Sequence, residues 1–271
     1  MRVTKSIKDF CKRVLPSEFL RLVYRYIWNP VRNFYWRLLD LDCELRSGLH
    51  VRIRNRPDWE MYNEVLVNGE YDIPLEHAIN AAESNRQFVV VDLGANVGYF
   101  ACQCANECII RGMGGYLSLI VVEAAPLMFQ ELQRRIESQA LLRDKVRLLH
   151  GLVGRKSGQA YITGSHLHYS NVACEKPRPG SSRVEYLNLD QELARFSTID
   201  LIKCDIEGSE FDFIDNYEEL LRKTRAAVFE FHRYGRNLDH ARNKLAHYGF
   251  SSRKVLRDSE HYSIEFFSRE S

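Results

Sequence analysis

The chain of 271 residues is long enough to bury the core of one α/β domain with an extension, rather than two equal domains. Its 45% hydrophobic and 27% charged residues are ordinary for a globular protein and exclude a disordered or fibrous chain. The net charge of +2 is unevenly spread, because residues 1–37 carry nine Lys and Arg against Asp9 and Glu18. The remainder is therefore net acidic, and we expect no nucleic-acid partner.

The N-terminal segment, residues 1–48, predicts a basic helical extension interrupted by Pro16 and Pro30. Arg21 and Arg25 lie four residues apart and so share one helix face. Such a helix packs on the catalytic domain or a dimer partner, or lies on an anionic membrane surface, and the sequence leaves these alternatives open. Because there is neither a run of 18 apolar residues nor a signal peptide, we expect a cytoplasmic protein, free or peripheral at a membrane.

The seven cysteines show no paired spacing of the kind that zinc sites use. Cys102, Cys104 and Cys108 crowd one expected helix, and Cys204 ends an expected core strand. We interpret these cysteines as small buried hydrophobes in a reducing compartment.

The remaining chain divides into a lead-in segment, residues 49–87, and a main domain, residues 88–271. The lead-in segment predicts a short strand, a helix around 58–67, a turn at Asn68-Gly69 and a second helix. In the main domain apolar strands alternate with amphipathic helices, which is typical of a parallel sheet covered on both faces. The expected strands cover 88–93, 117–123, 145–153, 199–205, 226–232, 251–257 and 262–268; the expected helices cover 97–110, 126–140, 209–222 and 238–248, and 154–190 is an irregular stretch with hairpin-like pieces.

The last two expected strands break this alternation. The connection RDSEHY is too short for a crossover helix, so strand 262–268 must run antiparallel to strand 251–257. A Rossmann-like α/β sheet that is mostly parallel and has an antiparallel final strand is the plan of class I methyltransferases. An ordinary NAD domain rarely ends in this way.

A glycine turn follows the first strand of the main domain, in VVVDLGANVGYF (89–100). The NAD fingerprint G-x-G-x-x-G keeps its middle glycine so that a pyrophosphate can approach the backbone. Here Asn96 stands between Gly94 and Gly98, where its side chain would crowd a pyrophosphate but could hydrogen-bond a smaller amino-acid group. The turn therefore favours a cofactor other than a dinucleotide.

Ionisable residues mark the ends of later strands. Glu123 ends strand 117–123, where a carboxylate can accept both ribose hydroxyls of an adenosine. Open α/β sheets place their chemistry at the carboxyl ends of their strands, so IDLIKCDIEGSEFDFI (199–214) and VFEFH (228–232) should contribute to one site. The side chains that we expect there are Asp205, Glu207, Glu230 and His232.

Together, VVVDLGANVGYF, VEAAPLMFQEL, DLIKCDIEGSEFDFI and EFH resemble, in order and spacing, the FkbM family of S-adenosylmethionine-dependent methyltransferases. LDQEL (189–193) resembles the family's segment before the fourth strand, and the match covers roughly residues 50–268. One departure is Leu152, a position where the family more often has alanine, which would alter the adenine pocket slightly.

The resemblance implies S-adenosylmethionine as cofactor and O-methylation of a hydroxyl on a sugar, glycan or polyketide-type natural product. It implies that Glu123 and Ala124 hold the ribose and that Gly151 and Leu152 flank the adenine. It also implies two groups at the other end: Asp92, Gly94, Asn96 and Gly98 would line the methionine moiety, and Asp205, Glu207, Glu230 and His232 would face the transferred methyl and the acceptor.

Methyl transfer to an alcohol benefits from alignment and from a general base. His232 is the first candidate because its usual pKa is closest to neutral, and Asp205 is the second. Alternation along the strand puts Glu230 on the same side as His232, where it could fix the imidazole tautomer. Asp205 with His232 or Glu230 could instead hold Mg²⁺, although nothing in the sequence requires a metal and we expect none.

The polar stretch 163–183 is long for a loop in a compact domain, and we expect it to close over acceptor and cofactor. Its candidate acceptor contacts are His166, His168, Tyr169, Ser170 and Asn171.

Two other functions compete with methyl transfer: a non-catalytic module that binds an adenosine cofactor, and an NAD-dependent oxidoreductase. The intact glycine turn with Glu123 and Asp205 argues against the first. Asn96 and the reversed final strand argue against the second. The identity of the acceptor, and N- or C-methylation in place of O-methylation, stay open.

Overall fold

The computed structural model describes residues 38, 40–84, 86–163, 173–233 and 235–269. Most of the predicted extension, and the candidate acceptor contacts His166, His168, Tyr169, Ser170 and Asn171, therefore lie outside the described residues. Packing divides the described residues into two compact units, one with those of 38–43 and 52–60 and the other with those of 44–51 and 61–269. The predicted domain limits at 48 and 87 do not coincide with the boundaries of these units.

Three short elements each contain one of the chain positions at which one unit ends and the other begins. They are strand β1 (Leu41–Glu44), strand β2 (His50–Ile53) and helix α4 (Arg56–Tyr62). Within the first unit, the Asn55 Oδ1 atom accepts the backbone N–H of Asp58, a polar cap that satisfies one of the unpaired donors at the start of α4.

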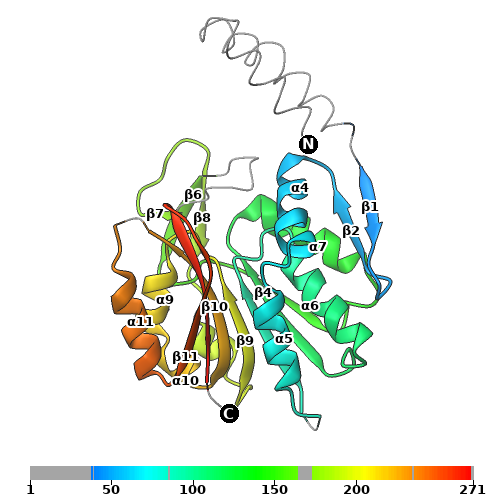
Figure 1. Ribbon diagram of the computed structural model, residues 1–271. Helices are drawn as coiled ribbons and strands as arrows, with labels where there is room; N and C mark the ends of the chain where they lie inside the picture. The colour runs from blue at the N-terminus through cyan, green and yellow to red at the C-terminus, as the bar shows by residue number, and fades with distance from the viewer. Residues whose placement is uncertain (1–37, 39, 85, 164–172, 234, 270–271) are drawn as a thin grey trace, which may run out of the picture. The chain divides into compact units, whose positions relative to one another are not determined.

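The second unit is built on a seven-stranded sheet in the order β11-β12-β10-β9-β3-β4-β5 (Figure 1). Strand β12 runs antiparallel to both of its neighbours, and the other paired strands are parallel. This order and this single reversed strand confirm the predicted class I methyltransferase sheet. The strands are β3 (Phe88–Leu93), β4 (Leu117–Glu123), β5 (Val146–His150), β9 (Ile199–Cys204), β10 (Thr224–His232), β11 (Ser252–Asp258) and β12 (Tyr262–Ser268).

Helices cover both faces of this sheet (Figure 1). One face carries α5 (Asp72–Asn80), α6 (Tyr99–Ile110) and α7 (Pro126–Glu137). The other carries α9 (Glu210–Asn216), α10 (Glu218–Arg222) and α11 (Leu238–His247). Two shorter elements are the π-helix η2 (Asn63–Val67) and helix α8 (Leu189–Glu192).

The single helix predicted over 209–222 is divided between α9 and α10 at Tyr217. The Tyr217 side chain is fully buried, and its hydroxyl donates to the carbonyl oxygens of Leu187 and Arg155, at 2.7 and 3.0 Å. The backbone of Tyr217, with φ of −118° and ψ of 43°, lies outside helical geometry, and no local sequence pattern indicates these distant hydrogen bonds.

The core follows from the alternation of side chains along the strands. Val89, Val91 and Leu93 of β3 join Phe213 and Phe229 in one buried cluster on the face of α9–α11. Cys102, Cys104, Cys108 and Cys204 are buried and unbridged, as predicted for small hydrophobes.

The irregular stretch predicted over 154–190 contains a small antiparallel sheet in the order β7-β6-β8. Its strands are β6 (Gln159–Thr163), β7 (Ala173–Cys174) and β8 (Ser181–Glu185). In the described part of the chain, no helix combines the length and the apolar character needed to cross a membrane.

Candidate active site

A cavity of about 520 Å³ lies at the carboxyl ends of β3, β4, β9 and β10, in the size range of small-molecule sites. The structure brings most of the predicted site residues together in its wall. These are Gly94, Asn96, Glu123, Ala124, Gly151, Leu152, Asp205, Glu207, Glu230 and His232.

Two predicted cofactor residues, Asp92 and Gly98, do not reach this wall. Asp92 is fully buried within β3. Gly98 begins helix α6 with a φ of 94°, and a Cβ there would lie 2.8 Å from Leu132 Cδ1. Both residues therefore support the glycine turn from behind instead of lining the cavity.

Besides Gly98, two further residues of the glycine turn have left-handed conformations. Gly94 has a φ of 75°, and a Cβ on it would lie 1.7 Å from the carbonyl oxygen of Asp205. Asn96 has a φ of 53°, unusual for a residue with a side chain. Such conformations concentrate at functional sites, where the surrounding structure holds them.

Glu123 lies at the end of β4 with 8% of its surface exposed. Its Oε2 atom accepts the N–H of Asn96 at 2.8 Å, and its Oε1 atom accepts the N–H of Ala125 at 2.7 Å. Burial raises the pKa of Glu123 to about 7, and the backbone hydrogen bonds oppose that rise. Each carboxylate oxygen keeps a further lone pair that a ribose hydroxyl could use.

Next to Glu123 the cavity wall is apolar. We call Glu123 and this apolar wall the adenosine end, which consists of Glu123, Ala124, Ala125, Met128, Leu152, Ile162 and Ala173. The N–H of Leu152 donates to the carbonyl oxygen of Glu185, which ties the wall to the small sheet. A buried carboxylate beside an apolar wall fits an adenosine. Sequence reasoning missed Ile162 and Ala173, although the alternation in QAYIT was a signal for the strand that carries the first.

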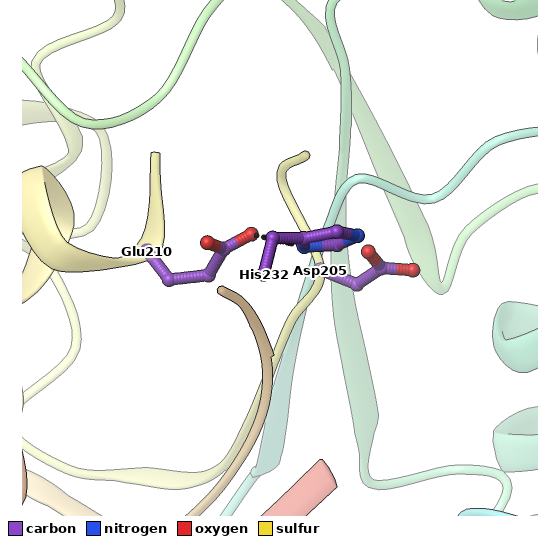
Figure 2. Close-up of side chains that lie close together, drawn as sticks. All are labelled: Asp205, Glu210 and His232. Carbon is purple, nitrogen blue, oxygen red and sulfur yellow. Dashed lines mark hydrogen bonds and ion pairs between the residues drawn. The ribbon is translucent and has the colours of Figure 1, made fainter. Parts of the chain in front are cut away.

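The opposite region of the wall carries Asp205, Glu207, Glu230 and His232, and the buried Glu210 lies behind it. We call these five residues the acidic edge. His232 Nδ1 lies 3.1 Å from Glu210 Oε1. Figure 2 marks this hydrogen bond with a dashed line. Glu210 is fully buried in the first turn of α9, and the same oxygen accepts the N–H groups of Ile206 and Gly208. The side chain that holds the imidazole is therefore Glu210.

This geometry corrects the role that the sequence suggested for Glu230. The Glu230 Oε1 atom lies 3.8 Å from the other imidazole nitrogen, Nε2, so it does not hold Nδ1. Glu207, whose φ of 53° is also left-handed, places Oε2 at 3.5 Å from Nε2. Only the tertiary fold brings α9 against the end of β10; the signal in the sequence was the acidic start of the helix in GSE.

The charges of the acidic edge displace two pKa values. Burial by itself lowers the pKa of His232, but the hydrogen bond and charge of Glu210, together with Asp205 and Glu207, raise it to about 9. Burial and the nearby Asp205 raise the pKa of Glu230 to about 9. At neutral pH His232 is therefore mainly an imidazolium and Glu230 mainly a neutral acid.

Three side chains of the acidic edge are also the candidate ligands for a bound cation. One donor atom each from Asp205, Glu210 and His232 lies within 4.8 Å of the others. Figure 2 shows the imidazole ring between the two carboxylates, and Nδ1 is engaged with Glu210. This arrangement suits a hydrogen-bonded imidazole better than three ligands converging on one ion.

Sequence reasoning also missed Lys203, a buried lysine of β9 in the cavity wall. Its Nζ atom donates to the carbonyl oxygen of Gly94 at 2.8 Å. The sequence did not indicate this residue as part of the site, because a lysine within an apolar strand only interrupts the hydrophobic pattern and gives no sign of a functional group.

The strand order defines a class I methyltransferase fold, and comparison with known families gives the particular family. Residues 92–252 match the family model described as the methyltransferase FkbM domain, more than half of the chain. The chain therefore belongs to the FkbM family of S-adenosylmethionine-dependent methyltransferases, as the motifs predicted. No curated protein matches it.

Several solved structures of methyltransferases show a weak likeness to this chain. The METTL16 methyltransferase domain is 13% identical with a TM-score of 0.45, covering 96% of this chain and 94% of that one. Magnesium protoporphyrin IX methyltransferase of Synechocystis PCC 6803 is 13% identical with a TM-score of 0.41, covering 93% and 96%. Precorrin-6y C5,15-methyltransferase of Geobacter metallireducens is 11% identical with a TM-score of 0.42, covering 72% and 87%. At these scores the likeness carries no argument about the site.

Proposed function

We propose that this methyltransferase transfers the methyl group to a hydroxyl of a sugar, glycan or natural-product acceptor. The observation that carries the proposal is the imidazole of His232 in the cavity wall, whose Nδ1 lies 3.1 Å from the buried carboxylate of Glu210 behind it. An alcohol must lose its proton as it attacks, and an imidazole oriented by a buried carboxylate is a common acceptor for that proton.

The residues at each end have separate tasks. When bound, S-adenosylmethionine supplies an electrophilic methyl group on its sulfonium. Glu123 would accept the ribose hydroxyls, and Ala124, Gly151 and Leu152 would exclude water around the adenine. Asn96, next to Gly94, would meet the methionine end.

At the acidic edge, Glu210 holds Nδ1–H, so the Nε2 atom of neutral His232 is the base. Because the pKa of His232 is about 9, this base is mostly protonated at neutral pH and becomes available as the pH rises. Asp205, the second candidate base, would orient the acceptor hydroxyl. The acceptor contacts predicted at His168, Tyr169, Ser170 and Asn171 stay predictions.

Membership of the family argues against an NAD-dependent oxidoreductase. A non-catalytic module would keep Glu123 but would not need an oriented imidazole facing the same cavity. The Glu210–His232 pair therefore favours an enzyme.

The test has two steps. First, the protein is titrated calorimetrically with S-adenosylhomocysteine and, in parallel, with NAD. We expect micromolar binding of the first ligand alone. Second, transfer of a labelled methyl group is measured to a panel of hydroxylated acceptors and to matched amines, at pH 7 and pH 9. Methylated hydroxyls, with higher rates at pH 9, support the proposal; transfer to amines alone would overturn O-methylation.

A further inference from the structure

The buried ammonium group of Lys203 contacts both the glycine turn and the acidic edge. Lys203 lies in the central strand β9 with 4% of its surface exposed. A lysine at such a position is costly unless its charge is compensated, so its presence calls for an explanation. None of the roles proposed above for the cavity residues explains why a lysine is buried at this position.

The contacts of Lys203 reach three separate places. Its Nζ atom donates to the Gly94 carbonyl oxygen at 2.8 Å, and it lies 3.3 Å from Asp92 Oδ1 and 3.6 Å from Asp205 Oδ2. Asp92 is its direct partner in the parallel register of β3 and β9. One group therefore touches the turn, the strand beneath it and the carboxylate beside the acceptor.

The turn and Asp205 also meet directly at this point. Gly94 packs so closely on the carbonyl oxygen of Asp205 that no side chain fits between them, and the N–H of Asp205 donates to the carbonyl oxygen of Leu93. Lys203 lies beside this contact: it donates a hydrogen bond to the carbonyl oxygen of Gly94 and forms an ion pair with the Asp205 carboxylate. Removing its ammonium would leave the backbone of the turn and the Asp205 side chain without their common partner.

The surroundings of Lys203 keep it charged. Charged or titratable groups face it from four elements: Asp92 on β3, Asp205 after β9, Glu230 on β10, and Tyr71 before α5, whose ring centroid lies 5.9 Å from Nζ. Burial by itself lowers the pKa of Lys203, but Asp92, Asp205 and Glu230 raise it overall. Both carboxylate oxygens of Asp92 are buried without a hydrogen bond from any described residue, so Lys203 is its counter-ion.

We infer that Lys203 is a positioning residue for the proposed methyl transfer: its ammonium holds the Gly94 carbonyl and the Asp205 carboxylate at a fixed separation. The inference rests on the proposed function, because the separation matters only if the cofactor occupies the turn and the acceptor meets Asp205.

A purely structural role must be distinguished from this one. Lys203→Met removes the ammonium but leaves Asp92 as an uncompensated buried charge, so it should also destabilise the fold. Lys203→Met combined with Asp92→Asn removes both charges and should recover folding. The matched control is Lys223→Met, because Lys223 is a half-buried lysine outside the cavity wall whose Nζ donates only to the carbonyl oxygens of Leu193 and Phe196 among the partners described.

The experiment measures S-adenosylhomocysteine affinity by calorimetry, and the unfolding midpoint, for the full-length chain and these variants. We expect at least a tenfold loss of affinity in Lys203→Met, a loss that persists in the double variant although its midpoint returns toward wild type. Lys223→Met should bind within twofold of wild type.

A second readout uses sinefungin, whose ammonium takes the place of the transferred methyl. If Lys203 had only a structural role, its loss would change the affinities for sinefungin and S-adenosylhomocysteine by the same factor. If its ammonium acts beside Asp205, its loss should raise the affinity for sinefungin relative to S-adenosylhomocysteine at least threefold. A double variant that binds within twofold of wild type would overturn the inference, as would failure of the double variant to fold. Failure of the wild-type protein to bind would instead refute the proposed function.

Discussion

The two ends of the cavity hold their polar groups by different means. At the adenosine end, the single carboxylate of Glu123 is held by two backbone amides within an apolar wall. At the acidic edge, side chains from separate elements hold one another, as in the contact between Glu210 and His232. The first arrangement needs the pairing of β3 with β4 and the turns that follow these two strands, whereas the second also requires α9 to pack against the end of β10.

The two ends of the cavity should therefore differ in their sensitivity to charge. Backbone amides do not titrate, so the adenosine end responds to pH only through Glu123 itself. The acidic edge contains coupled groups, and a change in one shifts the others. The following predictions test that contrast, beginning with the largest expected effect.

Replacing His232 with Gln should separate catalysis from cofactor binding. Loss of a general base lowers kcat by about 10²- to 10⁴-fold, while the affinity for S-adenosylhomocysteine should change less than about threefold because His232 lies at the acidic edge. Steady-state kinetics with an identified acceptor and calorimetry measure the two effects. An equal loss in both would show that the two ends are not independent.

The free energy of unfolding should fall as the pH rises through the range in which His232 and Glu230 of the acidic edge lose their protons. The folded-state pKa of His232 is about 9, above the unfolded value of about 6.5, so its stabilisation is complete below pH 6.5 and is lost as the pH passes 9. The loss from His232 is at most about 3 kcal/mol, and the raised pKa of Glu230 acts in the same direction.

Urea unfolding between pH 6 and pH 10 measures this slope. His232→Gln should flatten it, although Glu230 keeps part of it. Glu123, with a pKa of about 7, should add a separate loss of stability between about pH 4.5 and pH 7. A wild-type stability that does not change above pH 7 would contradict the charge arrangement at the acidic edge.

Replacing Glu123 with Ala should weaken S-adenosylhomocysteine binding by roughly 30-fold, since hydrogen bonds to a charged acceptor contribute about 2 kcal/mol. Calorimetric titration gives the change directly. The control is Glu137→Ala, an exposed glutamate on α7 that accepts a hydrogen bond from Gln133. Unchanged affinity in Glu123→Ala would remove the adenosine end as the cofactor site.

Replacing Glu210 with Gln should move the rise of kcat to lower pH by at least about one unit. Glu210 makes the largest contribution among the groups that raise the pKa of His232, whereas Glu207 makes a smaller one. The pH–rate profiles of Glu210→Gln and Glu207→Gln should therefore shift unequally. A larger shift in Glu207→Gln would mean that Nε2, not Nδ1, carries the controlling contact.

The smallest effect should come from removing divalent cations. Dialysis against EDTA should change the rate less than twofold, because Glu210 is already engaged with Nδ1. Loss of activity that Mg²⁺ restores would place a cation among Asp205, Glu210 and His232.

The sheet and one end of the site could be predicted well from the sequence. The apolar runs around FVVVDL and LSLIVVE determine strands, and the glycine turn determines where helix α6 can begin, because these signals act over a few neighbouring residues. The reversed strand β12 followed from a connection too short for a crossover. Glu123 was found because a strand end gives its position directly.

Other features were decided only by the tertiary structure. The selection of Glu210 over Glu230 to hold His232 depends on α9 packing against the end of β10, and the pairing of Lys203 with Asp92 depends on the register of two strands far apart in the sequence. The raised pKa of His232 likewise results from burial beside carboxylates of other elements. The order of residues along the chain therefore specifies which chemical groups reach the edge of the sheet. Their partners and protonation states were decided by assembly, because burial and charge act between segments that only the fold brings together.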